Sequence, residues 1–233
     1  MTALDDAVES LTATLGHLQD AAAADVEYLF RSLSGETWDA ESKRRLVDEL
    51  REILPDVMTA YGDIVADVTA AWYGDLAPDE PYAATAPEDV LPVERIETSI
   101  GWAVNAATNV ETALSRLVGT TQRMVMDAQR ATVAHNAAAE GVRYLRHCNY
   151  AGACNWCLAM ATRGAAYASA TTAVRGHDRC KCTAVPVRPG TSYTAPKMVR
   201  DAEKAYAAAR KQLISEGVST PSLDAIVKRM DVL

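Results

Sequence analysis

Apolar residues recur at helical spacing over the first third of the chain. Their separations mostly alternate between four and three positions, which places them along one face of an α-helix. The first such stripe consists of Leu4, Val8, Leu11, Leu15, Leu18, Ala22, Leu29 and Leu33. It predicts a helix that ends near Ser34 and Gly35.

A second stripe continues the same period over residues 46–68 and predicts a second helix. Thr37 or Asp39 precedes this stripe at a distance that suits an N-cap. Pro55 lies inside it, and because proline lacks an amide hydrogen we expect it to kink or split the helix. The short joint between the two helices predicts an antiparallel helical hairpin over residues 1–75, either packed at a bundle edge or extended as an arm.

The next segment, residues 76–92, differs in composition and predicts an exposed connector. It contains acidic residues, alanines and the prolines Pro78, Pro81, Pro87 and Pro92. Apolar residues then return at helical spacing, so residues 93–147 are predicted to form one long helical segment. Its helix is expected to end between Gly119 and Gly141.

The C-terminal part divides into two predicted pieces. Residues 148–190 contain all five cysteines and predict a small α+β module that resembles a zinc ribbon. Residues 191–233 predict basic helices, the first between Pro196 and Gly217 and the last from about Pro221. Many alanines and a single phenylalanine favour close helix packing over a large sheet. The predicted fold class is therefore mainly α, a long-helix bundle or hairpin that carries this module.

Length and composition indicate a soluble globular protein. A chain of 233 residues with 49% apolar residues is long enough to bury a core. The N-terminus lacks the basic and apolar regions of a signal peptide, and no apolar run approaches the length of a membrane span. We therefore expect a protein that is made in a cytosol and has no membrane partner. Clustered cysteines in that compartment are more often metal ligands than structural disulfides.

The charge is distributed unevenly along the chain. The net charge is −8, but residues 1–140 carry 9 basic and 25 acidic side chains, whereas residues 141–233 carry 14 basic and 6 acidic ones. This asymmetry predicts two surfaces for two kinds of partner, the basic one suited to nucleic acid or to an acidic protein. The alternative is that the two oppositely charged halves associate with each other.

Five candidate metal ligands form the pattern C-x2-C, nineteen residues, then H-x2-C-x-C. They are Cys154, Cys157, His177, Cys180 and Cys182. Thiolates and imidazole are the usual ligands of structural zinc, which takes four of them in tetrahedral geometry. Cys154 and Cys157 are the most secure ligands, and one of the other three is expected to lie outside the first coordination sphere. Cys148 is a weaker sixth candidate.

Other chemistries of these cysteines fit the sequence less well. A redox C-x-x-C pair normally opens a helix after a strand in a βαβ unit, and no such alternation precedes Cys154. A zinc deaminase needs an H-x-E element, which is absent. Inert reduced thiols remain an alternative. No P-loop, G-x-S-x-G or H-E-x-x-H motif is present, so we predict that the chain is not an enzyme.

The residues around the cluster resemble the C-terminal signature of MuF-like minor capsid proteins, the phage head morphogenesis family. The similarity covers about residues 150–187 and is closest to members from tailed phages of actinobacteria. It includes a cysteine pair followed by Gly164 and Tyr167, then H-x-x-C-x-C ending in Pro186. Asp178 departs from the family pattern, where proline often follows the histidine.

The resemblance implies a virion structural protein that associates with the portal inside the phage head. Such a protein acts in assembly, DNA packaging or ejection, and its partners would be the portal protein, the major capsid protein or packaged DNA. Candidate contacts to DNA or portal are Arg163, Arg175, Arg179, Lys181 and Arg188, and the surrounding basic residues include Arg143 and Arg146. Trp156 is expected to pack within the module.

Two other classes of function compete with a structural role. A zinc- or thiol-dependent enzyme would need an open coordination position or a thiol of low pKa. A transcription factor with a zinc ribbon is disfavoured by the acidic first 140 residues.

Overall fold

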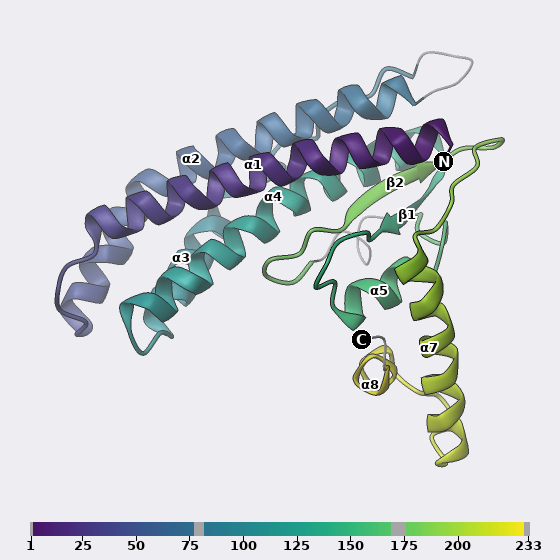
Figure 1. The fold of residues 1–233 in the computed structure, drawn as a ribbon. Coiled ribbons are helices and arrows are strands. Elements are labelled where there is room, and N and C mark those ends of the chain that lie inside the picture. The colour runs from purple at the N-terminus through teal and green to yellow at the C-terminus, as the bar shows by residue number, and fades with distance from the viewer. Residues whose placement is uncertain (1, 77–81, 169–175, 231–233) are drawn as a thin grey trace.

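A computed structural model describes residues 2–76, 82–168 and 176–230 of the chain. Within these ranges it has seven helices and one two-stranded sheet (Figure 1), which confirms the mainly helical fold class. The elements are α1 (Ala3–Leu33), α2 (Ala40–Asp75), α3 (Val93–Asn105), α4 (Val110–Glu140), β1 (Arg143–His147), α5 (Asn155–Ala161), β2 (Thr183–Val187), α7 (Lys197–Ser215) and α8 (Leu223–Arg229).

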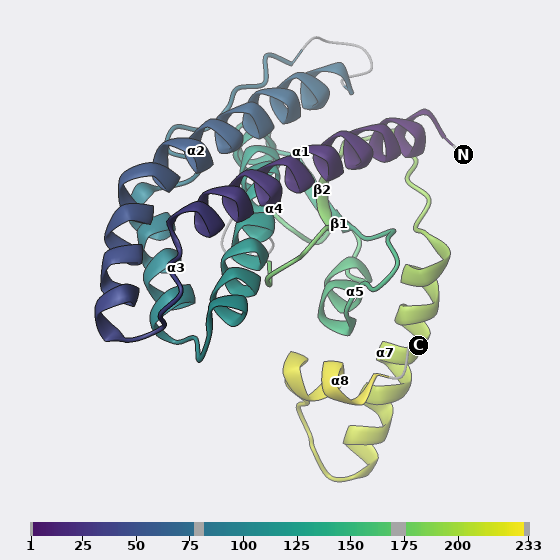
Figure 2. The ribbon, with the colours of Figure 1, turned by 60° about the vertical axis from the view of Figure 1, so that its left-hand side comes forward.

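Helices α1 and α2 form the predicted antiparallel hairpin, and their ends match the expected ones. Asp39, and not Thr37, is the N-cap of α2, because its carboxylate accepts hydrogen bonds from the amides of Glu41 and Ser42 at 3.1 and 2.8 Å. Helix α2 continues through Pro55 without a break and bends partway along its length (Figure 2). The missing amide of proline thus bends this helix and does not split it.

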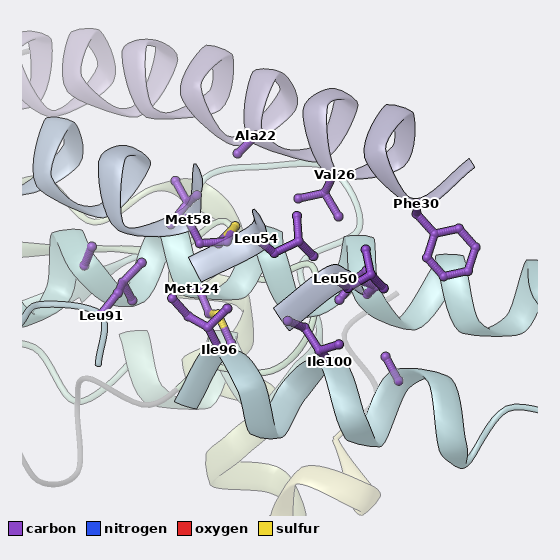
Figure 3. Packing of buried hydrophobic residues seen from close by; sticks show 14 of the residues in the cluster. Ala22, Val26, Phe30, Leu50, Leu54, Met58, Leu91, Ile96, Ile100 and Met124 are labelled. Carbon is purple, nitrogen blue, oxygen red and sulfur yellow. The ribbon is translucent and has the colours of Figure 1, made fainter. Parts of the chain in front are cut away.

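The hairpin is packed against the rest of the chain. Both α1 and α2 lie on α4, and α3 fills the space next to α2 and α4. One cluster of buried side chains joins all four helices (Figure 3); it includes Val26, Leu50, Ile100 and Met124. The predicted segments 1–75 and 93–147 therefore contribute to the same core, while the boundaries between domains remain predictions.

The predicted long helix after the connector is interrupted. Helix α3 ends at Asn105, and α4 begins after Asn109, whose side chain accepts a hydrogen bond from the Thr112 amide at 2.8 Å. The apolar stripe passes across this break because Val104 and Ala107 on one side and Leu114 on the other are buried in the same core. Periodicity alone therefore does not reveal the turn.

The end of α4 falls within the predicted interval. Gly141 follows the helix with φ of +76°, a left-handed conformation that glycine adopts without steric cost. Strand β1 begins two residues later, within the predicted segment 93–147 but after the interval in which its helix was expected to end. The chain turns back at Gly141 and pairs with β2, and helical periodicity did not predict this strand.

The sheet is a single antiparallel pair in which Arg143 faces Val187 and His147 faces Thr183. Pro186 is accommodated in β2 because it faces Tyr144 at a position where no ladder hydrogen bond is needed. The amide of Tyr144 donates instead to the carbonyl of Tyr167 at 3.0 Å.

The basic C-terminal helices are present as predicted, as α7 and α8. They contact α5 and each other, and they project from the sheet away from α2 (Figure 1, Figure 2). Within the described residues, none of the helices combines the length and the hydrophobicity that a membrane-spanning segment requires.

The packing of α2 predicts a large loss of stability at one residue and almost none at its neighbour. Leu54 is 1% exposed in the core, whereas Ile53 is 38% exposed. Leu54→Ala should lower the free energy of unfolding by about 2–5 kcal/mol, because it leaves a cavity. Ile53→Ala should change it by less than about 0.5 kcal/mol. Urea unfolding followed by circular dichroism measures both, and similar losses in the two variants would contradict this packing.

Candidate metal centre

The five predicted ligands converge on one place between α5, the start of β2 and α4. Cys154 is the N-cap of α5 and Cys157 lies in its first turn. His177 and Cys180 lie in the turn that precedes β2, and Cys182 directly precedes that strand. The structure therefore brings together all five residues that the ligand spacing singled out, and their role as ligands stays a prediction.

Their ligand atoms form two triangles that share one sulfur. In the first, Nε2 of His177 lies 3.0 Å from Sγ of Cys154 and 3.1 Å from Sγ of Cys157. In the second, Sγ of Cys157 lies 3.6 Å from Sγ of Cys180 and 3.5 Å from Sγ of Cys182. The sulfurs of Cys180 and Cys182 are 2.9 Å apart. Within each triangle every pair of ligand atoms is closer than 4.8 Å. This spacing is compatible with a shared metal ion.

The local backbone accounts for this convergence. Sγ of Cys154 accepts a hydrogen bond from the Cys157 amide at 3.4 Å, so both sulfurs lie at the N-terminus of α5. The Cys180 amide donates to the carbonyl of His177 at 3.1 Å and closes the H-x2-C turn. Cys180 and Cys182 then point to the same side, as alternate residues of an extended chain do.

The turn is held against α4. The Arg179 amide donates to the Gly119 carbonyl at 3.1 Å, and the Arg179 guanidinium donates to Ser115. A Cβ atom at Gly119 would lie 3.2 Å from the Cβ of Asp178, so the absence of a side chain permits this close approach. Asp178 also pairs with Arg123 of α4 at 3.1 Å. Asp178, where MuF-like proteins often have proline, thus makes a specific contact with α4.

The orientation of His177 favours metal binding through one nitrogen. Its Nδ1 lies 2.7 Å from the backbone carbonyl of Asp178, an arrangement that assigns the proton to Nδ1. Nε2 then faces Cys154 and Cys157 and is the nitrogen that can bind a metal. Metal-bound histidines commonly donate their second nitrogen to a carbonyl in this way.

Two buried arginines contact the sulfurs from the other side. Arg130 of α4 and Arg146 of β1 are both 0% exposed. Arg146 donates to Sγ of Cys182, and Nη1 of Arg130 lies 3.7 Å from Sγ of Cys180 and 2.6 Å from the Cys182 carbonyl. Arg130 also forms an ion pair with Asp127.

These contacts were not predicted from the sequence. The sequence places Arg146 among the basic residues around the module, and it places Arg130 inside the predicted helical segment. The burial of Arg130 can be inferred from its spacing on α4. It lies four residues after Met126 and three before Val133, on the same buried face of the helix. For Arg146 the sequence provides no comparable signal.

The electrostatics favour the thiolate form of Cys154 and Cys182, whereas hydrogen bonds with Cys154, Cys180 and Cys182, together with burial, raise the pKa of the Cys157 thiol. Hydrogen bonding with Cys157, opposed by burial and assisted by His177, lowers the pKa of Cys154 to about 4. The hydrogen bond with Cys154 raises the pKa of His177 to about 9, so without a metal Nε2 keeps a proton that a bound ion replaces. Hydrogen bonds with Cys157 and Cys180, and then the charges of Arg146 and Arg130, lower the pKa of Cys182. Thiolate sulfurs and an imidazole nitrogen are a donor set that suits zinc or a softer ion.

Cys148 is separate from this donor set. Its side chain is fully buried among apolar residues, and burial raises the pKa of its thiol. It belongs to neither triangle of ligand atoms. The structure thus gives Cys148 a packing role.

The predicted contacts to DNA or portal differ in their surroundings. Arg163 and Lys181 are exposed. Arg179 is exposed as well, but its guanidinium is already bonded to Ser115. Arg175 lies outside the described residues.

Arg188 corrects the prediction of an exposed contact. It is 7% exposed, and its guanidinium forms an ion pair with Glu140 at 2.6 Å. The same group lies 4.5 Å from the ring centroid of Tyr73 and donates to the Tyr73 carbonyl. Arg188 therefore ties the end of β2 to α2 and α4 and does not face a partner.

Trp156 packs within the module as predicted. Its ring meets the His177 ring edge-on at a centroid distance of 6.4 Å, and the Arg146 guanidinium lies 5.8 Å from its centroid. It is partly buried against the apolar side chains around α5.

A comparison with protein families finds a match that covers both the helical core and the C-terminal module. A protein-family model described as VG15 protein matches residues 2–209, which include the helical core and the whole Cys/His cluster. No curated protein matches the chain. No solved structure matches it either.

The contacts of Arg146 predict a large effect of its removal. Arg146→Met should lower the free energy of unfolding by about 3–5 kcal/mol, because the buried Cys182 thiolate loses its hydrogen bond from Arg146. Arg143→Met, three residues earlier on the same strand, provides the matched control. Arg143 is exposed, so that variant should lose less than about 1 kcal/mol. Equal stability of the two variants in urea unfolding would show that the cluster does not depend on the buried arginine.

Proposed function

Because this chain belongs to the VG15 protein family, a family of viral proteins, we propose that it is a structural protein of a phage virion. More specifically, we propose a MuF-like minor capsid or head morphogenesis protein of a tailed phage of actinobacteria. It would associate with the portal inside the head and act in assembly, DNA packaging or ejection. The observation that carries the proposal is the Cys/His cluster, which fastens the C-terminal module to the helical core.

The other residues of the MuF-like signature have structural roles that support this proposal. Gly164 adopts φ of +58° just after α5. The buried Tyr167 donates its hydroxyl to the Met160 carbonyl at 2.8 Å and pairs with Tyr144. Pro186 lies in β2 opposite Tyr144, where no ladder hydrogen bond is needed. The signature thus coincides with residues that shape the module around the cluster.

We propose that the cluster binds one structural zinc ion through Cys154, Cys157, His177 and Cys180. A tetrahedral ion with Zn–S bonds of about 2.3 Å places sulfurs about 3.8 Å apart. Both the 3.6 Å from Cys157 to Cys180 and the 3.5 Å from Cys157 to Cys182 are close to this, so the choice of Cys180 rests on its turn with His177. Cys180 is linked to His177 by the turn hydrogen bond. Cys182 accepts a hydrogen bond from Arg146, which suits a thiolate next to the coordination sphere.

The alternative is a zinc- or thiol-dependent enzyme. One observation favours it, namely the lowered pKa of Cys154, which is only half-buried. The burial of the other sulfurs opposes it, because Cys157, Cys180 and Cys182 are 0% exposed and a substrate does not reach them. A closed set of protein ligands is typical of structural zinc, whereas catalytic zinc keeps one position open.

The surface charges fit a protein that connects other components. The exposed sides of α1 and α2 are acidic and suit docking on the portal or major capsid protein. The exposed lysines and arginines of α7 suit non-specific contact with DNA or an acidic surface.

The proposed location predicts where the protein lies in a particle. Labelled antibody or an asymmetric cryo-EM reconstruction of phage heads should place it at the portal vertex, inside the capsid. Its absence from purified virions, or an even distribution over the capsid lattice, would overturn the proposal. The measurement is independent of whether the cluster holds a metal.

The proposed ligand set predicts which cysteines are needed for zinc. Cys154→Ser and Cys180→Ser should lose most of the bound zinc, whereas Cys182→Ser should keep about one ion per chain. Cys148→Ser is the control, since that buried thiol belongs to neither triangle. Metal content and the thiolate-to-metal absorption of the cobalt form measure the outcome. Retention of zinc in Cys180→Ser and its loss in Cys182→Ser would reverse the assignment of the two residues.

Removal of the metal should loosen the module and spare the helical core. With both Cys154 and Cys157 replaced by serine, trypsin should cut within residues 148–187 while α1–α4 stay folded. The reason is that the free energy of metal binding contributes to the folding of this segment. Persistence of a trypsin-resistant fragment over residues 148–187 would show that the cluster does not hold the module together.

A further inference from the structure

A groove with both basic and apolar walls lies between the end of α5 and the outer part of α7. Its volume is about 510 Å³, and it lies away from the Cys/His cluster. Arg163, Arg210 and Lys211 supply positive charge, while Tyr206 and Ile214 supply apolar surface. Ile214 is 43% exposed, which is a large apolar area for a residue at a groove wall.

The cations of this groove are not neutralised within the chain. Among the residues that the structure describes, no ion pair joins Arg163, Arg210 or Lys211 to a carboxylate. Lysines elsewhere on the same helix differ in this respect, since Lys197 and Lys204 both pair with Asp201. The groove therefore presents free positive charge next to exposed apolar side chains.

Helix α2 presents the complementary surface. A stripe of exposed carboxylates runs along the side of α2 that faces away from the core; its members are Asp48, Glu52, Asp56, Asp63 and Asp67. None of them forms an ion pair within the described part of the chain. The stripe is about 29 Å long at 1.5 Å per residue, similar to the length of the 19-residue helix α7.

Two exposed isoleucines flank this acidic stripe. Ile53 and Ile64 are 38% and 47% exposed and lie on the same edge of it, next to the buried face of α2. The stripe and the groove thus match in two respects, since each combines unpaired charge with exposed apolar side chains and the charges have opposite sign.

These two surfaces do not meet within one molecule. Helix α7 projects from the sheet on the side away from α2 in both views (Figure 1, Figure 2). We propose that the groove between α5 and α7 binds the acidic stripe of α2 from a second copy of this chain. Because the two contacting surfaces differ, the contact is head-to-tail, and it forms a ring if the rotation between copies closes.

Nucleic acid fits the groove less well than a second copy. A duplex offers phosphates but no apolar side chains for Ile214 and Tyr206, and Glu203 lines the same groove. Association between copies also explains why the acidic and basic residues are divided between the two parts of the chain. The inference does not depend on the proposed virion role.

Charge reversal on each surface tests the contact. Sedimentation velocity of the wild-type protein at low ionic strength should show a mass that rises above the monomer with concentration and falls towards it in high salt. The groove variant Arg210→Glu/Lys211→Glu and the stripe variant Glu52→Lys/Asp56→Lys should each weaken association about tenfold or more. Both pairs of residues are exposed, so circular dichroism should show unchanged folding.

A mixture of the two variants provides the decisive measurement. An equimolar mixture should associate again, because each reversed surface then meets an oppositely charged partner. Lys197→Glu/Lys204→Glu, which changes the charge of α7 by the same amount outside the groove, is the control and should associate like the wild type.

Three results would overturn the proposal. They are a wild-type protein that stays monomeric at low ionic strength, a control variant that loses as much association as the groove variant, and a mixture that does not recover. Binding of a labelled DNA duplex that is lost in the groove variant, with no association between copies, would assign the groove to nucleic acid instead.

Discussion

The contact between buried arginines and buried sulfurs is the interaction on which the C-terminal half of this structure depends. Two guanidinium groups that are fully removed from water cost several kcal/mol each unless negative charge lies next to them. Asp127 provides part of that charge for Arg130. Sγ of Cys180 lies next to both arginines, and Sγ of Cys182 accepts a hydrogen bond from Arg146. The Cys182 thiolate thus stabilises the arginines, and the arginines in turn lower the pKa of Cys182.

This dependence joins two parts of the chain that would otherwise be weakly connected. Helix α4 packs one face into the core with α1, α2 and α3, and the other face contacts the sheet and the turn that carries His177 and Cys180. Gln19 of α1 adds a second link, since its amide donates to the Cys180 carbonyl at 3.1 Å. The position of the cluster is therefore set by the long helices, and not by the module alone.

The sequence predicted the parts of this arrangement that depend on local patterns. Helical periodicity located α1, α2 and α7, and ligand spacing located all five members of the cluster. The turn between α3 and α4 escaped prediction because residues on both sides of it face the same core, so the apolar period continues through the break. Strand β1 escaped because five residues carry little periodic signal. The burial of Arg146 and Arg188 depends on partners far away in the sequence, which no local pattern reveals.

The small size of the C-terminal core explains why the cluster matters to it. Four cysteines are among the buried side chains around α5, α7 and α8, and several of the others are alanines. Alanine buries little area, and at about 25 cal/mol per Å² such a core provides little stabilisation against the conformational entropy of its chain. Small modules of this kind usually rely on a crosslink or a metal ion. The cysteines thus serve both as packing residues and as candidate ligands, so replacing one of them affects packing and coordination together. Zinc content and proteolysis, measured on the same variants, separate these two effects.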